Sequence, residues 1–248
     1  MQAAPEPAAI SRREARMREE TAIEIVLLRH GEPDWTPAGG LSVLDAALTT
    51  RGRMQAEAAA KALLPLGLDA LYVSPLRRAQ ETAEPIAKAT GLELVTIEGL
   101  AEIGIPLEGI SQIEVDAFFR RAAQRRLGEH WSGWPGGESF RDFHTRVTGA
   151  IAALLGQHGV VCESEDEFRV WRLPAQKRRI AVVAHGGTNA VALTHLLDIQ
   201  GVPWEWNRFE MELAAYAVVQ SRAVGMTGFV WSLQNFNEVD HLRTAGLR

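Results

Sequence analysis

A nearly unbroken apolar run, Ile23-Glu24-Ile25-Val26-Leu27-Leu28, ends abruptly in Arg29-His30-Gly31-Glu32. Such a run, rich in β-branched residues, is typical of a strand buried on both faces of a parallel sheet. The residues that follow stand at the carboxyl end of this strand, where open α/β sheets bind their ligands. Taken alone, the stretch fits a polar strand end followed by a surface turn as well as it fits a functional site.

Two later segments favour a functional site over a surface turn. The apolar run Arg179 to Ala184 leads directly into His185-Gly186-Gly187-Thr188, which repeats the form of the first run. The short run Ala70 to Val73 leads into Ser74 to Arg78, so that arginine also follows the end of a third strand. An isolated loop histidine is usually structural or solvated. Two histidines on matched strand ends, with arginines beside them, predict an active site.

Strand and helix patterns alternate along the chain. Strands are expected at 70–73, 92–97, 179–184, 211–220 and 228–234, with a hairpin insertion at 160–178. Helices are expected from Thr49 or Thr50 to Leu64, from Ser74-Pro75 to about Glu84, over 111–127, from Glu138-Ser139 to about Leu155, and over 189–197. This order predicts a three-layer α/β/α sandwich with a mostly parallel central sheet and an antiparallel edge.

No linker or internal repeat divides the 248 residues, so we expect a single domain over 21–248. Residues 1–20 are rich in Ala and Pro and then in charge, and we expect a tail that is disordered or carries a short helix. A late strand at the edge of the sheet would allow a homodimer to form.

Composition excludes several classes of function. A net charge of −5 argues against a general nucleic-acid binder, which would be basic. No apolar run approaches the roughly 18 residues that cross a membrane, and no apolar segment typical of a secretory signal is found, so we expect a cytoplasmic protein. The single cysteine, Cys162, excludes an internal disulfide and a cysteine-rich metal site.

Five motifs in order resemble the histidine phosphatase superfamily, which includes the cofactor-dependent phosphoglycerate mutases and many bacterial phosphatases. They span roughly residues 22–242 and are Leu28-Arg29-His30-Gly31-Glu32, Ser74 to Ala83, Leu100-Ala101-Glu102 with Glu108-Gly109, Gly136-Gly137-Glu138-Ser139, and Val183-Ala184-His185-Gly186-Gly187. The ending Asn235 to Leu242 is also similar. Glu81 stands where the family usually has glutamine, Leu107 replaces a common tryptophan, and the 160–178 segment is longer than usual.

The resemblance implies a phosphoglycerate mutase-like fold and metal-independent phosphoryl transfer without a cofactor. His30 would be the nucleophile that forms a phosphohistidine, and nearby cations should lower its pKa. Arg29 and Arg78 would hold phosphoryl oxygens, since a planar guanidinium binds two at once. A protonated or hydrogen-bond-donating His185 would complete the pocket. Glu102 would be the general acid and then the base, with Glu108 the weaker candidate.

Other residues are assigned to substrate binding. Gly31 would let the backbone approach the phosphate, Gly186 is expected beside it, and backbone N–H groups at helix N-termini could also bind the phosphate. Glu32 and Thr188 either line the pocket or support it, and Trp35, Trp131 and Trp134 either shape access or anchor loops. Arg120, Arg121, Arg125 and Arg126 are better interpreted as a solvated helix face than as an anion site.

Three functions remain open. The resemblance favours a phosphatase that hydrolyses a small phosphorylated metabolite. The alternative is a phosphoglycerate mutase, but Gly31-Glu32-Pro33-Asp34-Trp35 replaces the Gly-Glu-Ser-x-x-Asn run of family mutases. A less favoured alternative is a non-catalytic module that binds phosphorylated ligands.

Overall fold

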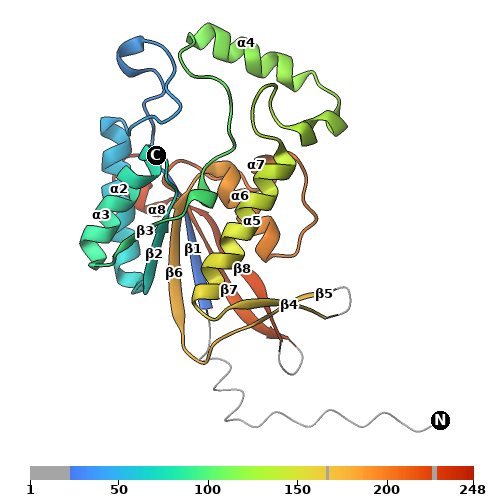
Figure 1. Cartoon of the computed structure of the whole chain (residues 1–248). Helices are drawn as coiled ribbons and strands as arrows, with labels where there is room; N and C mark the ends of the chain where they lie inside the picture. The colour runs from blue at the N-terminus through green and yellow to red at the C-terminus, as the bar shows by residue number, and fades with distance from the viewer. Residues whose placement is uncertain (1–22, 166–167, 225–227) are drawn as a thin grey trace, which may run out of the picture.

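A computed structural model describes residues 23–165, 168–224 and 228–248 of the chain. Its strands form one eight-stranded sheet in the order β3-β2-β6-β1-β7-β8-β5-β4, with helices on both faces (Figure 1). The α/β/α fold class expected from the sequence is therefore confirmed. The tail expected over 1–20 lies outside the described residues. The single domain stays a prediction, supported by the fact that all eight strands share one sheet.

The strands are β1 Ile23–Arg29, β2 Ala70–Val73, β3 Leu94–Thr96, β4 Val161–Glu165, β5 Phe168–Arg172, β6 Arg178–Ala184, β7 Tyr216–Val224 and β8 Gly228–Glu238. The α-helices are α2 Thr50–Leu63, α3 Arg77–Thr90, α4 Gln112–Ala123, α5 Phe140–Gln157, α6 Gly186–Leu196, α7 Glu205–Arg208 and α8 Asp240–Thr244. Short 3₁₀ turns occur at η1 Pro37–Gly39, η2 Leu64–Leu66, η3 Glu98–Leu100 and η4 Leu127–Ser132.

Strand β1 is buried on both faces, as its apolar run predicts. Its side chains alternate between two cores, because successive residues of a strand point to opposite faces. Val26 and Leu28 belong to the core that α2 and α3 complete, whereas Ile25 and Leu27 belong to the core that α5 and α6 complete. Figure 1 shows these two helical layers on either side of the sheet.

The sheet has a parallel half and an antiparallel half. Strands β3, β2, β6 and β1 pair in parallel. The pairings of β1 with β7, β7 with β8, β8 with β5 and β5 with β4 are all antiparallel. The hairpin expected in the 160–178 segment is confirmed as β4 and β5.

The late strands do not form a sheet edge, and this expectation was wrong. The hairpin joins β8 through the pairing of Trp171 with Phe229, so that β7 and β8 lie inside the sheet and β4 forms the edge. The homodimer stays a prediction that the late strands no longer support.

Helix starts differ from expectation at two of the strand ends. Helix α2 begins as expected, with the Thr49 side chain accepting the Gly52 N–H. Helix α3 begins only at Arg77, and Ser74 is not its N-cap because its hydroxyl is bonded elsewhere. Helix α6 begins at Gly186, directly after His185. None of the helices in the described part of the chain is long and apolar enough to span a membrane.

Candidate active site

The two histidines lie at the ends of neighbouring parallel strands. β1 and β6 pair in register with Arg29 opposite Ala184, and the His30 N–H extends the ladder by donating to the Ala184 carbonyl at 2.9 Å. The imidazole ring centroids of His30 and His185 are 5.1 Å apart and their planes are inclined by 59°. The sheet therefore sets the distance between the two rings.

His30 is buried and its hydrogen bonds define its tautomer. Its Nδ1 lies 2.7 Å from the Gly31 carbonyl, which can only accept, so Nδ1 carries the proton. Its Nε2 accepts from Nε of Arg78 at 3.3 Å. Burial lowers the pKa of His30 well below its ordinary value, and Arg78 and Arg29 lower it further. The expected direction of this pKa shift is confirmed, with burial rather than the cations as its largest cause.

Arg78 is a buried cation beside the Nε2 of His30. It is 3% exposed, donates to the Leu44 carbonyl at 3.0 Å, and its guanidinium lies 4.7 Å from the ring centroid of Trp35. Burial lowers its pKa to about 10, so the group stays charged at neutral pH. Its neighbour Arg77 points to solvent and pairs with Glu81 at 2.8 Å, as expected of a surface charge.

Arg29 supplies a second guanidinium on the same side of the sheet. It donates to the backbone carbonyl of Met211, while its buried Nε has no partner among the described residues. Burial lowers the pKa of Arg29, and the carboxylates of Glu102 and Glu210 oppose that shift. An unpartnered buried donor of this kind is suited to a phosphoryl oxygen.

His185 is fully buried and neutral. Burial lowers its pKa well below the ordinary value, and His30 and Arg78 lower it further. Of the two forms considered from the sequence, this direction favours the neutral hydrogen-bond donor over the protonated one. Its Nε2 lies 2.7 Å from Ser74 Oγ, and its Nδ1 has no partner within the described ranges.

Glu102 lies at the N-terminus of α6, next to the histidine pair. Its Oε2 accepts the Gly187 N–H at 2.9 Å, and its Oε1 lies 3.4 Å from Thr188 Oγ1. Thr188 also donates to the Ala101 carbonyl at 3.2 Å, so it supports the loop that carries Glu102. A Cβ at Gly187 would lie 2.5 Å from Glu102 Oε1, which explains why glycine occupies this position.

The Gly136-Gly137-Glu138-Ser139 motif holds the same loop from the other side. Arg146 of α5 donates to the carbonyls of Gly99 and Ala101 at 3.0 Å and forms an ion pair with Glu138 at 2.7 Å. The Glu138 N–H donates to the Gly104 carbonyl at 2.9 Å. The motif thus fixes the position of Glu102 without lying beside the histidines.

Three expected residues have other neighbours. A Cβ at Gly31 would lie 2.6 Å from the Gly52 carbonyl, so this glycine permits the loop to pack on α2. Glu32 accepts from Thr49 at 2.8 Å and from Arg51 at 2.9 Å at the start of the same helix. Glu108 accepts the Leu44 N–H at 2.6 Å. The structure brings His30, Arg29, Arg78, His185 and Glu102 together, and Gly186 beside Arg29.

Sequence reasoning missed several supporting groups. Ser74 bonds to His185, and Thr82 accepts the Gly31 N–H at 3.0 Å while donating to the Arg78 carbonyl at 2.6 Å. Both residues belong to the Ser74 to Ala83 motif, which was the available clue. The backbone carbonyls of Leu44 and Met211 could not be predicted as partners of the arginines, because every residue has a backbone carbonyl.

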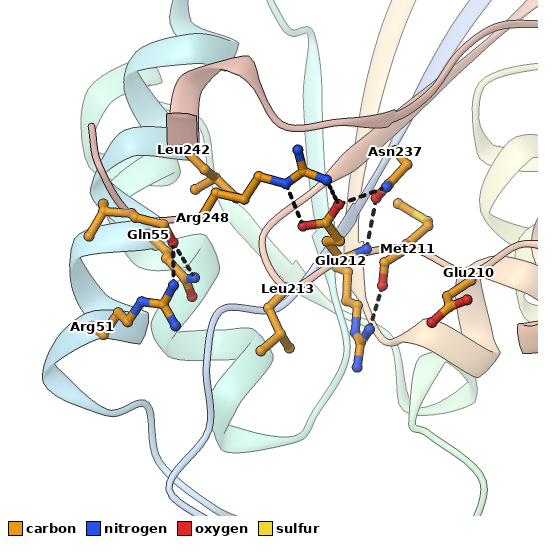
Figure 2. A pocket seen from close by; sticks show the side chains of 11 residues that line it. Arg51, Gln55, Glu210, Met211, Glu212, Leu213, Asn237, Leu242 and Arg248 are labelled. Carbon is orange, nitrogen blue, oxygen red and sulfur yellow. Dashed lines mark hydrogen bonds and ion pairs between the residues drawn. The ribbon is translucent and has the colours of Figure 1, made fainter. Parts of the chain in front are cut away.

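Two open pockets adjoin at Arg29. The larger, about 570 Å³, has both polar and apolar side chains in its lining. Figure 2 shows the Arg248 guanidinium on the Glu212 carboxylate, which also bonds Asn237. The smaller, about 340 Å³, contains Glu102 and several large apolar side chains. Among the described residues, no three His, Cys, Asp or Glu side chains gather closely enough to hold a metal ion.

The geometry joins four elements of nucleophilic phosphoryl transfer. A neutral imidazole presents Nε2, two guanidiniums supply positive charge, a neutral histidine has an unpartnered nitrogen, and a carboxylate stands at a helix N-terminus. Because phosphoryl transfer depends mainly on positioning and charge stabilisation, this set of groups is suited to it.

Comparison with known proteins agrees with this chemistry. A family model described as the histidine phosphatase superfamily (branch 1) matches residues 25–165. Phosphoserine phosphatase 1 from Hydrogenobacter thermophilus is 33% identical over 139 residues, which cover 55% of this chain and 66% of the relative. A probable phosphoglycerate mutase from Salmonella typhi is 27% identical over 91% of this chain and 97% of its own.

A solved structure extends the likeness to the fold. The native structure of mycobacterial glucosyl-3-phosphoglycerate phosphatase is 29% identical, covers 86% of this chain and 98% of its own, and superposes with a TM-score of 0.64. The family model covers more than half of the chain and includes His30, Arg78 and Glu102. This chain belongs to the histidine phosphatase superfamily, branch 1.

Proposed function

We propose that the protein is a phosphatase that hydrolyses a small phosphate monoester through a phosphohistidine on His30. The observation that carries this proposal is the Nε2 of His30, which is deprotonated, buried and 3.3 Å from a guanidinium nitrogen of Arg78. The family and its phosphatase relatives support the same reaction.

In the first step, Nε2 of His30 forms a bond to phosphorus while the bond from phosphorus to the ester oxygen breaks. Arg29 and Arg78 stabilise the charge on the phosphoryl oxygens, and Nδ1–H of neutral His185 donates to the same group. Glu102 gives its proton to the departing alkoxide. In the second step, Glu102 takes a proton from water, the water oxygen bonds to phosphorus, and the phosphohistidine bond breaks.

The first experiment measures hydrolysis of an aryl phosphate in the presence of EDTA by the wild type and by His30→Ala. We expect turnover by the wild type and none by the variant. His158→Ala is the matched control, because His158 contacts Tyr72 at the far end of α5 from the histidine pair. Acid-labile labelling of the wild type, absent from His30→Ala, would identify the phosphohistidine. Turnover that survives in His30→Ala would contradict the proposal.

A mutase is the second candidate, because the Salmonella typhi relative over 91% of the chain has that name. A mutase returns the phosphoryl group to a second hydroxyl of the same sugar acid instead of to water. The segment Pro33-Asp34-Trp35 disfavours it, since family mutases resemble one another there and this chain differs. Phosphoglycerate isomerisation that requires priming by a bisphosphorylated sugar acid, and exceeds hydrolysis, would favour the mutase.

A third candidate is a non-catalytic module for phosphorylated ligands, which is disfavoured because the sequence contains all five core residues. It would be favoured only by a protein that binds phosphate esters and neither hydrolyses nor isomerises them.

A further inference from the structure

Glu102 identifies which of the two pockets beside Arg29 receives the alcohol part of the substrate. A general acid must reach the leaving oxygen, so the alcohol lies on the same side of the phosphoryl group as the acid. Glu102 lines the smaller pocket and is absent from the larger one. In the lining of the larger pocket, Glu212 and Arg248 already form an ion pair with each other at 2.7 Å.

The smaller pocket combines Arg29 and Glu102 with a lining that is largely apolar. Six of its twelve lining residues carry large apolar side chains: Ile103, Ile105, Trp134, Trp206, Phe209 and Met211. The Trp134 and Trp206 rings are stacked, with centroids 6.2 Å apart and planes inclined by 19°. Its volume of about 340 Å³ lies at the lower end of the range for ligand pockets, about 300–1,000 Å³, and suits a small organic group.

The charges in this pocket oppose an acidic alcohol. Arg29 is the single cation among the described residues that line it, and its free Nε is needed by the phosphoryl group. Glu210 places an exposed carboxylate in the lining, close enough to Arg29 to raise the pKa of that guanidinium. A carboxylate on the substrate would enter this pocket with a like charge and without a free cation to pair with.

We propose that this pocket selects phosphate monoesters of uncharged, largely apolar alcohols and disfavours esters whose alcohol part carries a carboxylate. The proposal rests on the phosphatase function proposed above and names its substrate class. It also separates this chain from the relatives whose names specify phosphoserine or phosphoglycerate compounds.

The test compares 2-phenylethyl phosphate with 3-phosphoglycerate, two esters of primary alcohols. We expect kcat/KM for the phenylethyl ester to exceed that for 3-phosphoglycerate by about tenfold or more, the effect of a well-fitted apolar group. Trp206→Ala should abolish most of that preference, whereas Trp204→Ala, two residues away and outside the pocket lining, should retain it. Glu210→Lys should shift the preference about fivefold toward 3-phosphoglycerate, and Glu57→Lys, an exposed reversal on α2, should not.

Glu210→Lys changes an exposed side chain, so it tests the effect of charge on substrate preference even if Trp206→Ala fails to fold. In that case Trp206→Leu replaces the alanine variant. Equal preference for the two esters, or a preference unchanged in both Trp206 and Glu210 variants, overturns the proposal.

Binding to His30→Ala, measured by calorimetry with the same two esters, separates the two proposals. Tighter binding of the phenylethyl ester without turnover by the wild type would support the pocket assignment and overturn the phosphatase function. Turnover by the wild type with tighter binding of 3-phosphoglycerate would support the phosphatase function and overturn the pocket assignment.

Discussion

Ser74 Oγ lies 2.7 Å from Nε2 of His185, so that a hydroxyl at the end of β2 fixes an imidazole at the end of β6. The Leu76 N–H lies 3.3 Å from the same Oγ and donates to it, and we infer that the hydroxyl in turn donates its proton to Nε2. Neutral His185 then carries its own proton on Nδ1, the nitrogen without a protein partner in the described chain. Ser74 is therefore a positioning residue that sets the tautomer of His185.

Ser74→Ala should lower kcat about tenfold with little change in KM, because a lost hydrogen bond of a buried group costs about 1–3 kcal/mol. Nitrogen chemical shifts of His185 should report a mixture of tautomers in the variant and the single Nδ1–H form in the wild type. Ser74→Cys, which keeps a weak donor of similar size, should lie between them. A variant with the wild-type tautomer and reduced kcat would show that Ser74 acts in another way.

Gly187→Ala should displace Glu102, since the new Cβ would lie 2.5 Å from its Oε1. The carboxylate is the flexible partner, so we expect the fold to be kept and kcat for an alkyl phosphate to fall about 100-fold. The loss should be smaller for 4-nitrophenyl phosphate, whose leaving group needs less protonation. Gly149→Ala on α5, which meets nothing within 4 Å, is the control and should keep full activity. Equal losses on both substrates would argue against displacement of the acid.

Arg78→Lys should reduce kcat/KM by about 10²–10³, the usual effect of removing one donor to a developing anion. Lysine keeps the charge but cannot reach both His30 Nε2 and the Leu44 carbonyl, the two contacts of the planar guanidinium. Arg77→Lys is the adjacent control, because that exposed side chain pairs with Glu81 at the surface and its substitution should change the rate within about twofold. A change within about twofold in Arg78→Lys as well would mean that Arg78 acts through its net charge alone.

Acidification should destabilise the protein through its buried histidines. The pKa values of His30 and His185 are lowered well below the ordinary value in the folded state, so the unfolded state binds more protons below about pH 6.5. The free energy of unfolding should therefore fall as the pH drops from about 6.5 toward the folded-state values, and be at its full value above that range.

Denaturant unfolding from about pH 7.5 to about pH 5 measures this slope. His185→Gln removes one of the two groups and should make the slope shallower than that of the wild type. An identical slope in the two proteins would show that His185 is not excluded from protonation by folding. NMR titration of the wild type should find both imidazoles neutral below pH of about 6.5.

The parallel strands and the histidine pair could be predicted because burial imposes a continuous apolar pattern that ends where the polar site begins. Helix α3 shows where this reasoning stops. Ser74-Pro75 has the local pattern of a helix start, but the serine hydroxyl bonds to His185, 111 positions away, and the helix begins at Arg77. Local preference is weaker than a buried hydrogen bond between distant segments.

Glycine roles were harder to predict than charged ones. Gly31 was expected to let the backbone approach the phosphate, which stays a prediction, and the structure adds that a side chain there would meet the Gly52 carbonyl. The sequence shows that the residue is glycine. It does not show which neighbouring atom leaves no room for a side chain.

The pairing of Arg29 with Ala184 places the site's two imidazoles one residue beyond a continuous hydrogen-bonded ladder. Their separation is therefore built into the sheet, whereas Trp206 and Glu210 stand on the connection between β6 and β7. Insertions or exchanges in that connection can alter which alcohol is accepted without moving the attacking nitrogen. Reactivity and substrate range can thus diverge independently over evolutionary time, each under the control of a different part of the chain.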